Sequence, residues 1–562
     1  MKIIGIVSDE RFRYQLHEMT VEFFKPESIE IQVGGLPHLA CNDEETDQND
    51  EEDILLRDSD DRIICPDGYD LIIKVDIEEL EEDFRFSVEL KGKKDSSLAA
   101  QNNVGVAQND SYAVRTDNKM ICQFDNGTDG CAVCCLMTEL PVFLSNKELP
   151  VLNRGRKALR ALLYDIFCEI SGKSLPWGSM IGVRPAKTVN MLFEEGYSEE
   201  EIFQELTQKY HASQEKSELA INVAKNQSRM LAQTDKNEIS IYIGIPFCPT
   251  RCLYCSFTSN PIKKYENLVD EYIDVLIEEM EATKGIVKDK EYKIKSVYIG
   301  GGTPTSISAE QLDKLLDAVD RIWGQSHMLE FCVEAGRPDS ITRKKLEVLK
   351  KYNVTRICIN PQTLNNETLE RIGRRHTAET FFKAFELSRE IGFDNINIDV
   401  IAGLPGEDFL MFKNTLDGVL ELEPENITVH TMSLKRASDL NRDKDEYIMT
   451  AAEEVNKMVS YAYKNIVSCG LSPSYMYRQK NMLGNLENVS YSKEGYNSYY
   501  NIHIMEEDMN ILAFGAGGAT KIVDEVKIER FFNAKDVEGY IKRKDEIVDK
   551  KKKFIYNNLV SL

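Results

Sequence analysis

The chain has 562 residues, of which 42% are hydrophobic, and a formal net charge of −25. A chain of this length is expected to form more than one domain, and its apolar content is sufficient for sizeable cores. A surface this acidic would repel a phosphate backbone, so a nucleic acid is disfavoured as the main partner.

The hydropathy pattern excludes a membrane protein of the helical kind. No stretch approaches 18 uninterrupted apolar residues, and the first residues, MKIIGIVSDERFRYQ, lack an apolar segment of signal-peptide length. We therefore expect no membrane span and a cytoplasmic location. Thirteen cysteines in such a chain are interpreted as thiols or metal ligands rather than as a disulfide framework.

Residues 1–150 are predicted to form a small α/β domain with acidic and polar loop insertions. The strand-like pieces KIIGIV, YDLIIKV and FRFSVEL accompany an amphipathic helix pattern near residues 15–24. In segment 42–62 eleven of 21 residues are Asp or Glu, and segment 93–111 is rich in Ser, Asn, Gln and Ala. We expect both segments to be mobile loops, with an acidic interaction tail as the alternative for the first.

Residues 151–236 have the pattern of a helical connecting region. RKALRALLYDIFCEISG has apolar residues at helical spacing, and SEEEIFQEL begins with Ser198 and Glu201 at the spacing of a capping box. Between them lies PWGSMIGVRPAKT, whose chemistry alone indicates no role.

Residues 237–433 repeat a strand, a turn and a helix. Six strands are predicted, at residues 239–246, 295–299, 329–334, 356–360, 396–401 and 427–432, and a helical stretch follows each of the first five. Tandem β/α units predict a parallel sheet with right-handed crossovers. Six units rather than eight form a partial barrel with an opening for a large substrate, and its site is expected where the strands end.

Residues 434–562 are predicted to form a smaller α+β cap or lid. The segment contains a long helical pattern at 447–469, the glycine-rich run FGAGGAT and a basic amphipathic helix at the C-terminus.

Three cysteines stand close together directly after the first barrel strand, in YIGIPFCPTRCLYCSF. Cys248, Cys252 and Cys255 have C-x3-C-x2-C spacing, one thiol short of a closed tetrahedral zinc site. Three thiolates can hold three irons of a [4Fe–4S] cluster and leave the fourth iron open for another ligand. A zinc site completed from elsewhere and buried unligated thiols are the alternatives.

The second barrel strand ends in YIGGGTPT. Glycines at this place let a small ligand approach the backbone without a side-chain clash, although a structural turn is the ordinary reason for such a run. Because the glycine run is expected to lie next to the cysteine loop, we interpret it as a ligand-binding segment rather than as a structural turn.

With these motifs the chain resembles the radical S-adenosylmethionine superfamily, and within it the oxygen-independent coproporphyrinogen III oxidase group. The resemblance covers roughly residues 150–562 and rests on YIGIPFC, GGGTPT, NIDVIAGLPG and RQKNMLGN, while PWGSMIGVRP and FCVEAGRPDSI are most similar to the HemZ branch. It implies a partial (β/α)6 barrel, a [4Fe–4S] cluster held by Cys248, Cys252 and Cys255, and S-adenosylmethionine on the open iron.

The resemblance also implies which residues bind S-adenosylmethionine. Those that match family positions are Tyr242, Tyr254, Gly301, Gly302, Thr303, Glu334, Gln362, Arg374, Asp399 and Ser433. By its sequence alone, Arg374 in RIGRRHT could equally be a solvated helix charge. Asp399 lies in an otherwise apolar strand, where a carboxylate needs a partner or a purpose.

Other reactive side chains are interpreted as structural. His376 and His430 have no ligand partner at useful spacing, and Cys332 and Cys358 are expected in the core of strands. Redox or metal chemistry is disfavoured for the CAVCC cysteines (Cys131, Cys134 and Cys135), because no fourth ligand lies nearby in the sequence.

The expected activity is the oxidative decarboxylation of coproporphyrinogen III propionates to vinyl groups, with a small flavodoxin- or ferredoxin-type electron donor. The oxidase proper has a histidine where this chain has Gly244, and a fourth cysteine where it has Phe257. The chaperone branch has a histidine where this chain has Tyr500. The alternatives are a haem- or tetrapyrrole-binding chaperone and a radical enzyme acting on another tetrapyrrole. Cationic side chains should bind the propionates, with Arg478 and Lys480 as candidates.

Overall fold

The computed structural model describes residues 2–24, 28–33, 56–57, 63–64, 71–79, 84–92, 113–115, 121–125, 131–136 and 151–559, the last range with gaps at 181, 183, 233, 236, 258, 290, 325, 436–437, 443–446, 480 and 525–526. Contacts divide the chain into two compact units, one of Met1–Gly182 with Met191–Glu218 and one of Val183–Asn190 with Leu219–Leu562. The finer division at residues 150, 236 and 433 stays a prediction.

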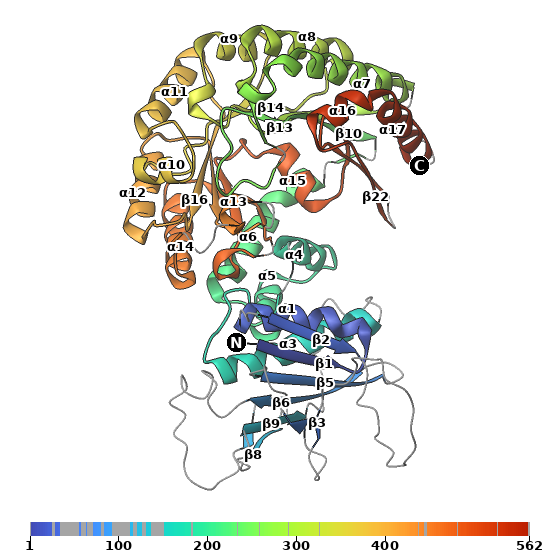
Figure 1. The fold of residues 1–562 in the computed structure, drawn as a ribbon, viewed down its shortest axis with the longest axis vertical. Helices are drawn as coiled ribbons and strands as arrows, with labels where there is room; N and C mark the ends of the chain where they lie inside the picture. The colour runs from blue at the N-terminus through green and yellow to red at the C-terminus, as the bar shows by residue number, and fades with distance from the viewer. Residues whose placement is uncertain are drawn as a thin grey trace, which may run out of the picture. The chain divides into compact units, whose positions relative to one another are not determined.

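The first unit contains a seven-stranded sheet in its described residues, ordered β2-β1-β5-β6-β9-β8-β7 (Figure 1). Its strands are β1 (Lys2–Val7), β2 (Ser28–Val33), β5 (Leu71–Glu79), β6 (Phe84–Gly92), β7 (Ala113–Arg115), β8 (Ile121–Asp125) and β9 (Cys131–Leu136); β3 (Leu56–Arg57) and β4 (Ile63–Ile64) pair separately. The three strand-like pieces expected in this region therefore form β1, β5 and β6.

Two helices provide the core of this unit. Side chains of α1 (Arg13–Phe24) and α3 (Val151–Ser171), among them Phe23 and Phe167, pack with Ile3 and Val75 of the sheet. Segment 93–111 lies outside the described residues, as does segment 42–62 apart from β3. The backbone of the CAVCC cysteines lies in β9, but their side chains are outside the description.

The connecting region is helical, as expected. It contains α3, α4 (Pro185–Glu194), α5 (Glu199–Gln204) and α6 (Gln214–Leu231). The capping box at the start of α5 is confirmed, because the Ser198 side chain accepts from the Glu201 backbone and the Glu201 side chain accepts from the Ser198 backbone.

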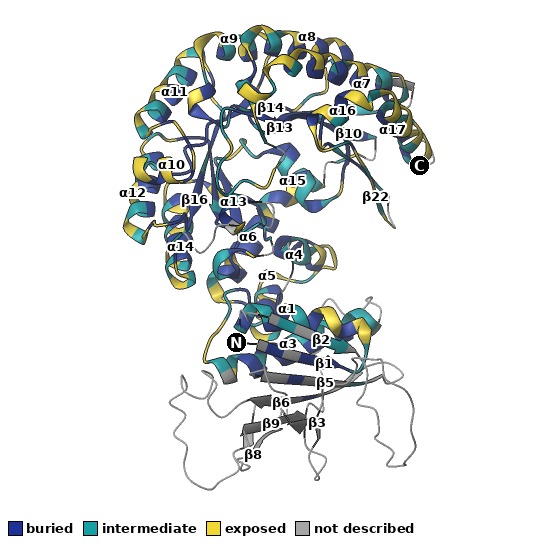
Figure 2. Cartoon of the chain, in the orientation of Figure 1, coloured by how far each residue is buried: buried dark blue, intermediate teal, exposed yellow. Residues whose placement is uncertain are grey.

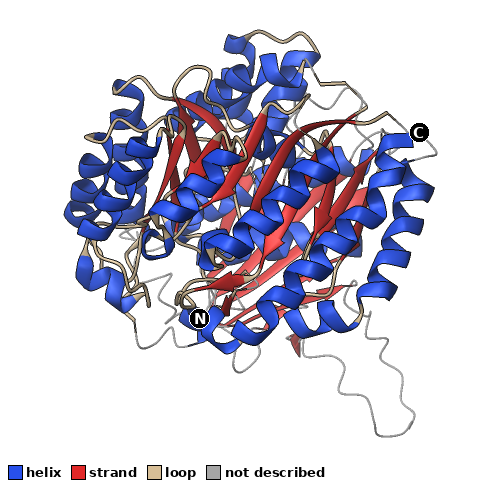
Figure 3. Ribbon diagram, turned by 90° about the horizontal axis from the view of Figure 1, so that it is seen from above, coloured by secondary structure: helices blue, strands red, loops and turns tan. Residues whose placement is uncertain are grey.

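The second unit contains the expected partial barrel. Six parallel strands follow in chain order: β10 (Glu238–Ile245), β13 (Lys293–Gly301), β14 (Glu330–Glu334), β15 (Arg356–Cys358), β16 (Ile396–Ala402) and β17 (Asn426–Thr431). Helices connect them on the outer face: α7 (Val269–Asp289), α8 (Ala309–Trp323), α9 (Arg343–Lys351), α10 (Asn366–Arg371), α11 (Ala378–Ile391) and α12 (Phe409–Leu420) (Figures 1 and 3). The ends of the predicted strands lie within about two residues of the observed ends.

The burial pattern reflects this layering. The strands are buried while the helices expose their outer sides (Figure 2), as is usual for parallel sheets covered on both faces. Ser308 and Gln311 form a capping box at the start of α8. Cys332 and Cys358 are buried in β14 and β15, which confirms them as core residues.

The C-terminal segment contains helices and strands, and its strands continue the barrel sheet at both edges. β19 (Asn488–Ser492) pairs with β17, and β20 (Asn510–Phe514) pairs with β10. With β18 (Ser472–Tyr477), β21 (Ala519–Val523) and β22 (Ile528–Phe532), the described residues form one eleven-stranded sheet, ordered β18-β19-β17-β16-β15-β14-β13-β10-β20-β21-β22. Figure 1 shows α15 (Tyr499–Glu506) on the inner side of this sheet.

The remaining helices are α13 (Asp439–Arg442), α14 (Ala452–Ser468), α16 (Val537–Lys542) and α17 (Lys544–Leu559). The helix expected from residue 447 begins only at Ala452, because the preceding residues bond to the loop after β16: the Gly406 amide donates to Ile448 O at 3.0 Å, and Thr450 Oγ1 donates to Leu404 O at 3.1 Å. Within the described ranges, no helix combines the length and hydropathy needed to cross a membrane.

Candidate active site at the strand ends

The cysteine loop is closed at its base. β11 (Phe247–Cys248) pairs with β12 (Asn260–Pro261), and the Asn260 amide and side chain both donate to Pro246 O, at 2.9 and 3.0 Å. The loop directly follows the carboxyl end of β10, and barrel folds place their sites at this end of the strands. Its three cysteines are present as thiols.

The glycine segment, residues 300–303 at the end of β13, packs directly against this loop. The amides of Gly302 and Thr303 donate to Ile245 O and Phe247 O, at 2.8 and 2.7 Å. A β-carbon on Gly302 would stand 3.0 Å from Cys248 Sγ, which is tighter than most real contacts, and 2.6 Å from Phe247 O, which is closer than real β-carbons come. The Thr303 hydroxyl lies 3.5 Å from the same sulfur. Burial raises the pKa of the Cys248 thiol to about 12, and such a thiol becomes a ligand only when a bound metal removes its proton.

Two buried guanidinium groups lie near Cys252. Arg337 Nη1 lies 3.8 Å from Cys252 Sγ and donates to Thr250 Oγ1 at 3.0 Å. Arg374 donates to Asn360 O at 2.5 Å and is 8% exposed, so the interpretation as a solvated helix charge is wrong. Burial lowers the pKa of Arg374, but the neighbouring Tyr254 hydroxyl and Cys252 thiol outweigh burial, and its pKa is raised.

Glu334 lies at the end of β14 and faces the glycine segment. The Tyr298 hydroxyl donates to Glu334 Oε1, and a β-carbon on Gly300 would stand 3.0 Å from Glu334 Oε2. Burial raises the pKa of Glu334 to about 7, with a smaller contribution from the charge of Asp399, against the lowering effect of the Tyr298 hydrogen bond. This carboxyl group can therefore change its charge near neutral pH.

Three tyrosine rings stack beside Glu334. Tyr242 and Tyr298 are cross-strand neighbours in β10 and β13, with ring centroids 6.2 Å apart. Tyr500 of α15 stacks on Tyr298 at 4.5 Å. Burial raises the pKa of Tyr242 and of Tyr500, so both rings stay neutral phenols.

Asp399 has the partners that a buried carboxylate requires. Asn397 Nδ2 donates to Asp399 Oδ1 at 2.7 Å, and His430 Nε2 lies 3.5 Å from Asp399 Oδ2. Burial raises the pKa of Asp399, but His430 and Asn397 outweigh it, so the pKa is lowered and the group is ionised. His430, interpreted from the sequence as structural, is thus a direct neighbour of a predicted site residue.

The other predicted residues occupy the same rim. Gln362 has a positive φ of 70°, donates its amide to Asp399 O at 3.1 Å, and its buried Oε1 lacks a hydrogen-bond partner among the described residues. A buried acceptor left open is a feature that a bound ligand can satisfy. Ser433 follows β17 and forms an isolated bridge with Met482. Burial, with Arg374 and Arg337 nearby, lowers the pKa of His376 to about 3, which keeps it neutral.

The residues present fit a [4Fe–4S] cluster held by three thiolates. The donor set is three cysteine sulfurs, and hydroxyl and guanidinium groups lie within reach of Cys248 and Cys252; hydrogen bonds to the sulfurs are usual around such clusters. Across the described residues, no three ligating side chains converge on a single-ion site.

Sequence reasoning missed three residues near this site: it did not single out Arg337 or Tyr298, and it interpreted His430 as structural. A usable signal existed for two of them. Arg337 stands three residues after Glu334 at the same strand end, and Tyr298 lies in the strand beside Tyr242. Of the two propionate candidates, Arg478 is buried and donates to Asn485 Oδ1, and Lys480 lies outside the described residues.

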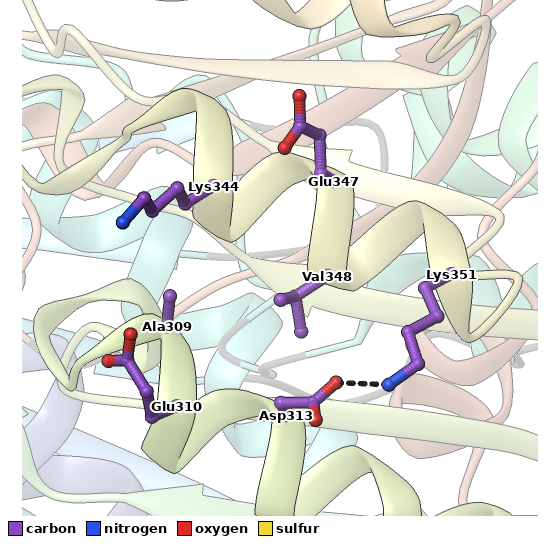
Figure 4. A pocket seen from close by; sticks show the side chains of 7 residues that line it. All are labelled: Ala309, Glu310, Asp313, Lys344, Glu347, Val348 and Lys351. Atoms are coloured by element: carbon purple, nitrogen blue, oxygen red, sulfur yellow. Dashed lines mark hydrogen bonds and ion pairs between the residues drawn. The ribbon is translucent and has the colours of Figure 1, made fainter.

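A separate groove lies on the outside of the barrel, between α8 and α9 (Figure 4). It has a volume of about 400 Å³ and is bounded on one side by the ion pair of Lys351 Nζ with Asp313 Oδ1, at 2.6 Å. Its lining residues are Ala309, Glu310, Asp313, Lys344, Glu347, Val348 and Lys351, and it contains none of the predicted site residues.

The chain is similar to several known proteins. Residues 242–418 match the Radical SAM superfamily. The chain is 43% identical over 392 residues to the oxygen-independent coproporphyrinogen-III oxidase-like protein HemZ of Bacillus subtilis, covering 68% of this chain and 78% of that protein. It is 42% identical over 194 residues to the heme chaperone HemW of the same species, covering 34% of this chain and half of that protein (50%). Among solved structures, the coproporphyrinogen III oxidase HemN of Escherichia coli, described as a radical SAM enzyme, matches with a TM-score of 0.45 and 20% identity over 57% of this chain and 72% of that one.

Proposed function

Because the chain belongs to the radical SAM superfamily and to its HemZ-like branch, we propose that it is an oxygen-independent coproporphyrinogen III oxidase. The proposed reaction converts two propionate side chains of coproporphyrinogen III into vinyl groups, which yields protoporphyrinogen IX for haem biosynthesis. Each conversion removes one hydrogen atom, CO2 and one further electron, which must pass to a one-electron acceptor. The one-electron chemistry that removes the hydrogen atom would come from a [4Fe–4S] cluster and S-adenosylmethionine.

The chain's own residues would bind and orient these groups. Cys248, Cys252 and Cys255 would be the cluster ligands, and Gly301, Gly302 and Thr303 would present backbone to S-adenosylmethionine without side-chain obstruction. Glu334, when ionised, would accept from its ammonium group. The further proposed contacts are Tyr242, Tyr254, Gln362, Arg374, Asp399 and Ser433.

The observation that best supports this proposal is the joint position of Cys248, Gly302 and Glu334. Gly302 approaches the Cys248 sulfur so closely that a β-carbon would stand 3.0 Å away, and Glu334 approaches the adjoining Gly300 equally closely. A thiol, a bare backbone segment and a carboxyl that titrates near neutrality thus meet at one strand edge, which suits a cluster beside an amino-acid-bearing cofactor.

Anaerobic turnover tests the proposal. The cluster is reconstituted, S-adenosylmethionine, a reductant and coproporphyrinogen III are added, and 5′-deoxyadenosine and porphyrin products are separated by chromatography. We expect both products from the natural chain and neither from Cys252→Ala. Deoxyadenosine without any change in the porphyrin would refute this substrate while retaining the radical chemistry.

A tetrapyrrole-binding chaperone is the second candidate, favoured by the 42% identity to HemW over 194 residues. The buried Tyr500, stacked on Tyr298, stands where that branch has a histidine and offers only a neutral phenol. Haem titration with absorbance detection separates the two, because tight stoichiometric haem binding without decarboxylation would favour the chaperone. The proposed location is the cytoplasm, where thiols stay reduced, and the proposed electron donor is a flavodoxin- or ferredoxin-type protein.

A further inference from the structure

We propose that Arg337, held by Asp339, is a positioning residue for the iron–sulfur cluster: it fixes Cys252 and stabilises the reduced form of the cluster. This inference rests on the cluster binding in the proposed function and does not depend on which tetrapyrrole, if any, is the substrate.

The guanidinium group of Arg337 is fixed from one side. Asp339 accepts from its Nε at 2.9 Å and from its Nη2 at 2.8 Å, a bidentate geometry that sets the plane of the fork. Arg337 is only 2% exposed. A buried cation of this kind is retained only where its hydrogen-bonding groups are used, and two of its nitrogens are used by Asp339.

The third nitrogen is directed at the cysteine loop. Nη1 donates to Thr250 Oγ1 at 3.0 Å and to Thr250 O at 3.4 Å, and lies 3.8 Å from Cys252 Sγ. The carboxylate of Asp339 binds the other side of the fork, so the positive end of the pair faces the sulfur. By contrast, the neutral Thr303 hydroxyl is the group that lies within hydrogen-bond distance of the Cys248 sulfur.

This arrangement should stabilise the oxidised and the reduced states of a cluster to different extents. Reduction adds one negative charge, and part of that charge lies on the sulfurs. A hydrogen bond from a cation to a ligand sulfur therefore stabilises the reduced state more than the oxidised state and raises the reduction potential. Removing Arg337 should make the cluster harder to reduce.

The test measures the cluster and not turnover. Arg337→Gln, Arg337→Lys and Arg337→Met are reconstituted anaerobically, and reduction is followed by electron paramagnetic resonance during a potentiometric titration without S-adenosylmethionine or substrate. For Arg337→Gln we expect the ratio of reduced to oxidised cluster at a fixed potential to fall about tenfold, which is a shift of 59 mV for a one-electron couple. Arg337→Lys keeps the charge without the fork, so it should shift less and in the same direction. Arg337→Met removes the charge as Arg337→Gln does, so it should shift by a similar amount.

Arg343→Gln is the matched control, because Arg343 is an exposed arginine of α9 that pairs with Glu390 Oε2 at 2.7 Å. It should leave the potential unchanged. An unchanged potential in Arg337→Gln, at full iron and sulfide content, overturns the proposal. If Arg337→Gln does not fold, Arg337→Met decides, and an unchanged potential there likewise overturns the proposal.

The two proposals fail separately. A wild-type protein that binds a cluster but does not convert coproporphyrinogen III refutes the oxidase, whereas the shift in potential would still stand. Normal turnover by the wild type together with unshifted variants refutes only the role of Arg337.

Discussion

Gly302 lies against Cys248 so closely that a β-carbon at Gly302 would stand 3.0 Å from the thiol sulfur and 2.6 Å from the carbonyl oxygen of Phe247. The second contact is with backbone, which cannot rotate away. The glycine segment and the cysteine loop can therefore keep this spacing only when residue 302 has no side chain.

We predict that Gly302→Ala weakens cluster binding in the reconstituted protein. The new methyl group would push the glycine segment away from Phe247 and Cys248, and at least a several-fold loss of bound iron is expected. Iron and sulfide content after anaerobic reconstitution measures it.

Gly285→Ala is the control, since Gly285 lies in α7 and a β-carbon there meets nothing within 4 Å. It should keep full iron content and gain about 0.5–1 kcal/mol of helix stability. Full iron content in Gly302→Ala would contradict the prediction.

The binding of S-adenosylmethionine should depend on pH through Glu334. Its pKa is raised to about 7, so the carboxylate that can attract an ammonium group is lost as the pH falls through 7. We expect affinity for S-adenosylmethionine to fall by up to about tenfold per pH unit below that value. Equilibrium dialysis between pH 5.5 and 8.5 measures it.

Glu334→Gln provides the comparison for that titration. Its amide has no charge to lose, so it should bind more weakly at pH 8 and with little dependence on pH. The same slope in both proteins would show that another group titrates.

The pair formed by Lys551 of α17 and Glu279 of α7 should contribute strongly to the stability of the barrel unit. Both side chains are almost completely buried, and Glu279 also accepts from Asn533 Nδ2 at 2.8 Å. Lys551→Met would leave the Glu279 carboxylate buried without its cation. We expect a loss of about 3–5 kcal/mol in the free energy of unfolding, measured by chemical denaturation.

An exposed pair between the same two helices is the matched control for that experiment. Lys544 Nζ lies 2.6 Å from Glu278 Oε2 in solvent. Lys544→Met should leave the midpoint nearly unchanged, because exposed ion pairs contribute little. Similar losses in both variants would argue against burial as the cause.

Because Arg184 donates a hydrogen bond to Glu507, the free energy of unfolding should depend on pH in the acid range. The hydrogen bond from Arg184, with Lys521 and Arg530 nearby, lowers the pKa of Glu507 to about 2. A carboxyl group with a lowered pKa contributes stability above its unfolded pKa, and that contribution is lost as the pH falls toward 2. Arg184→Gln should therefore be less stable at pH 7 and lose less on acidification to pH 3, as thermal unfolding would show.

Arg321→Gln removes an exposed ion pair with Glu281 and serves as the control, with an acid dependence close to that of the natural chain. A wild-type-like acid dependence in Arg184→Gln would refute the assignment. The result also concerns PWGSMIGVRPAKT, because Arg184 and Lys187 of this segment contact Glu507 and the Glu506 carbonyl oxygen.

Much of the barrel and the cysteine site could be predicted because the signals are local. Hydrophobic periodicity indicates each strand and helix. Ser198 and Ser308, each followed three residues later by Glu201 or Gln311, indicate where two helices begin. The C-x3-C-x2-C spacing similarly places three thiols on one loop whatever the rest of the chain does. Parallel strands with helical crossovers then bring their ends to one rim.

Other features depend on contacts between distant residues and were not predictable. The pairing of β20 with β10 joins residues more than 250 positions apart, and no local pattern indicates that the C-terminal strands extend the barrel sheet. The burial of Arg374, the pairing of His430 with Asp399 and the approach of Arg337 to Cys252 likewise appear only after the strand ends are assembled. The sequence by itself determined the elements and the reactive thiols, because periodicity and spacing act over a few residues. The tertiary structure decided which charges surround those thiols, because burial and electrostatics depend on neighbours that the chain brings together only when it folds.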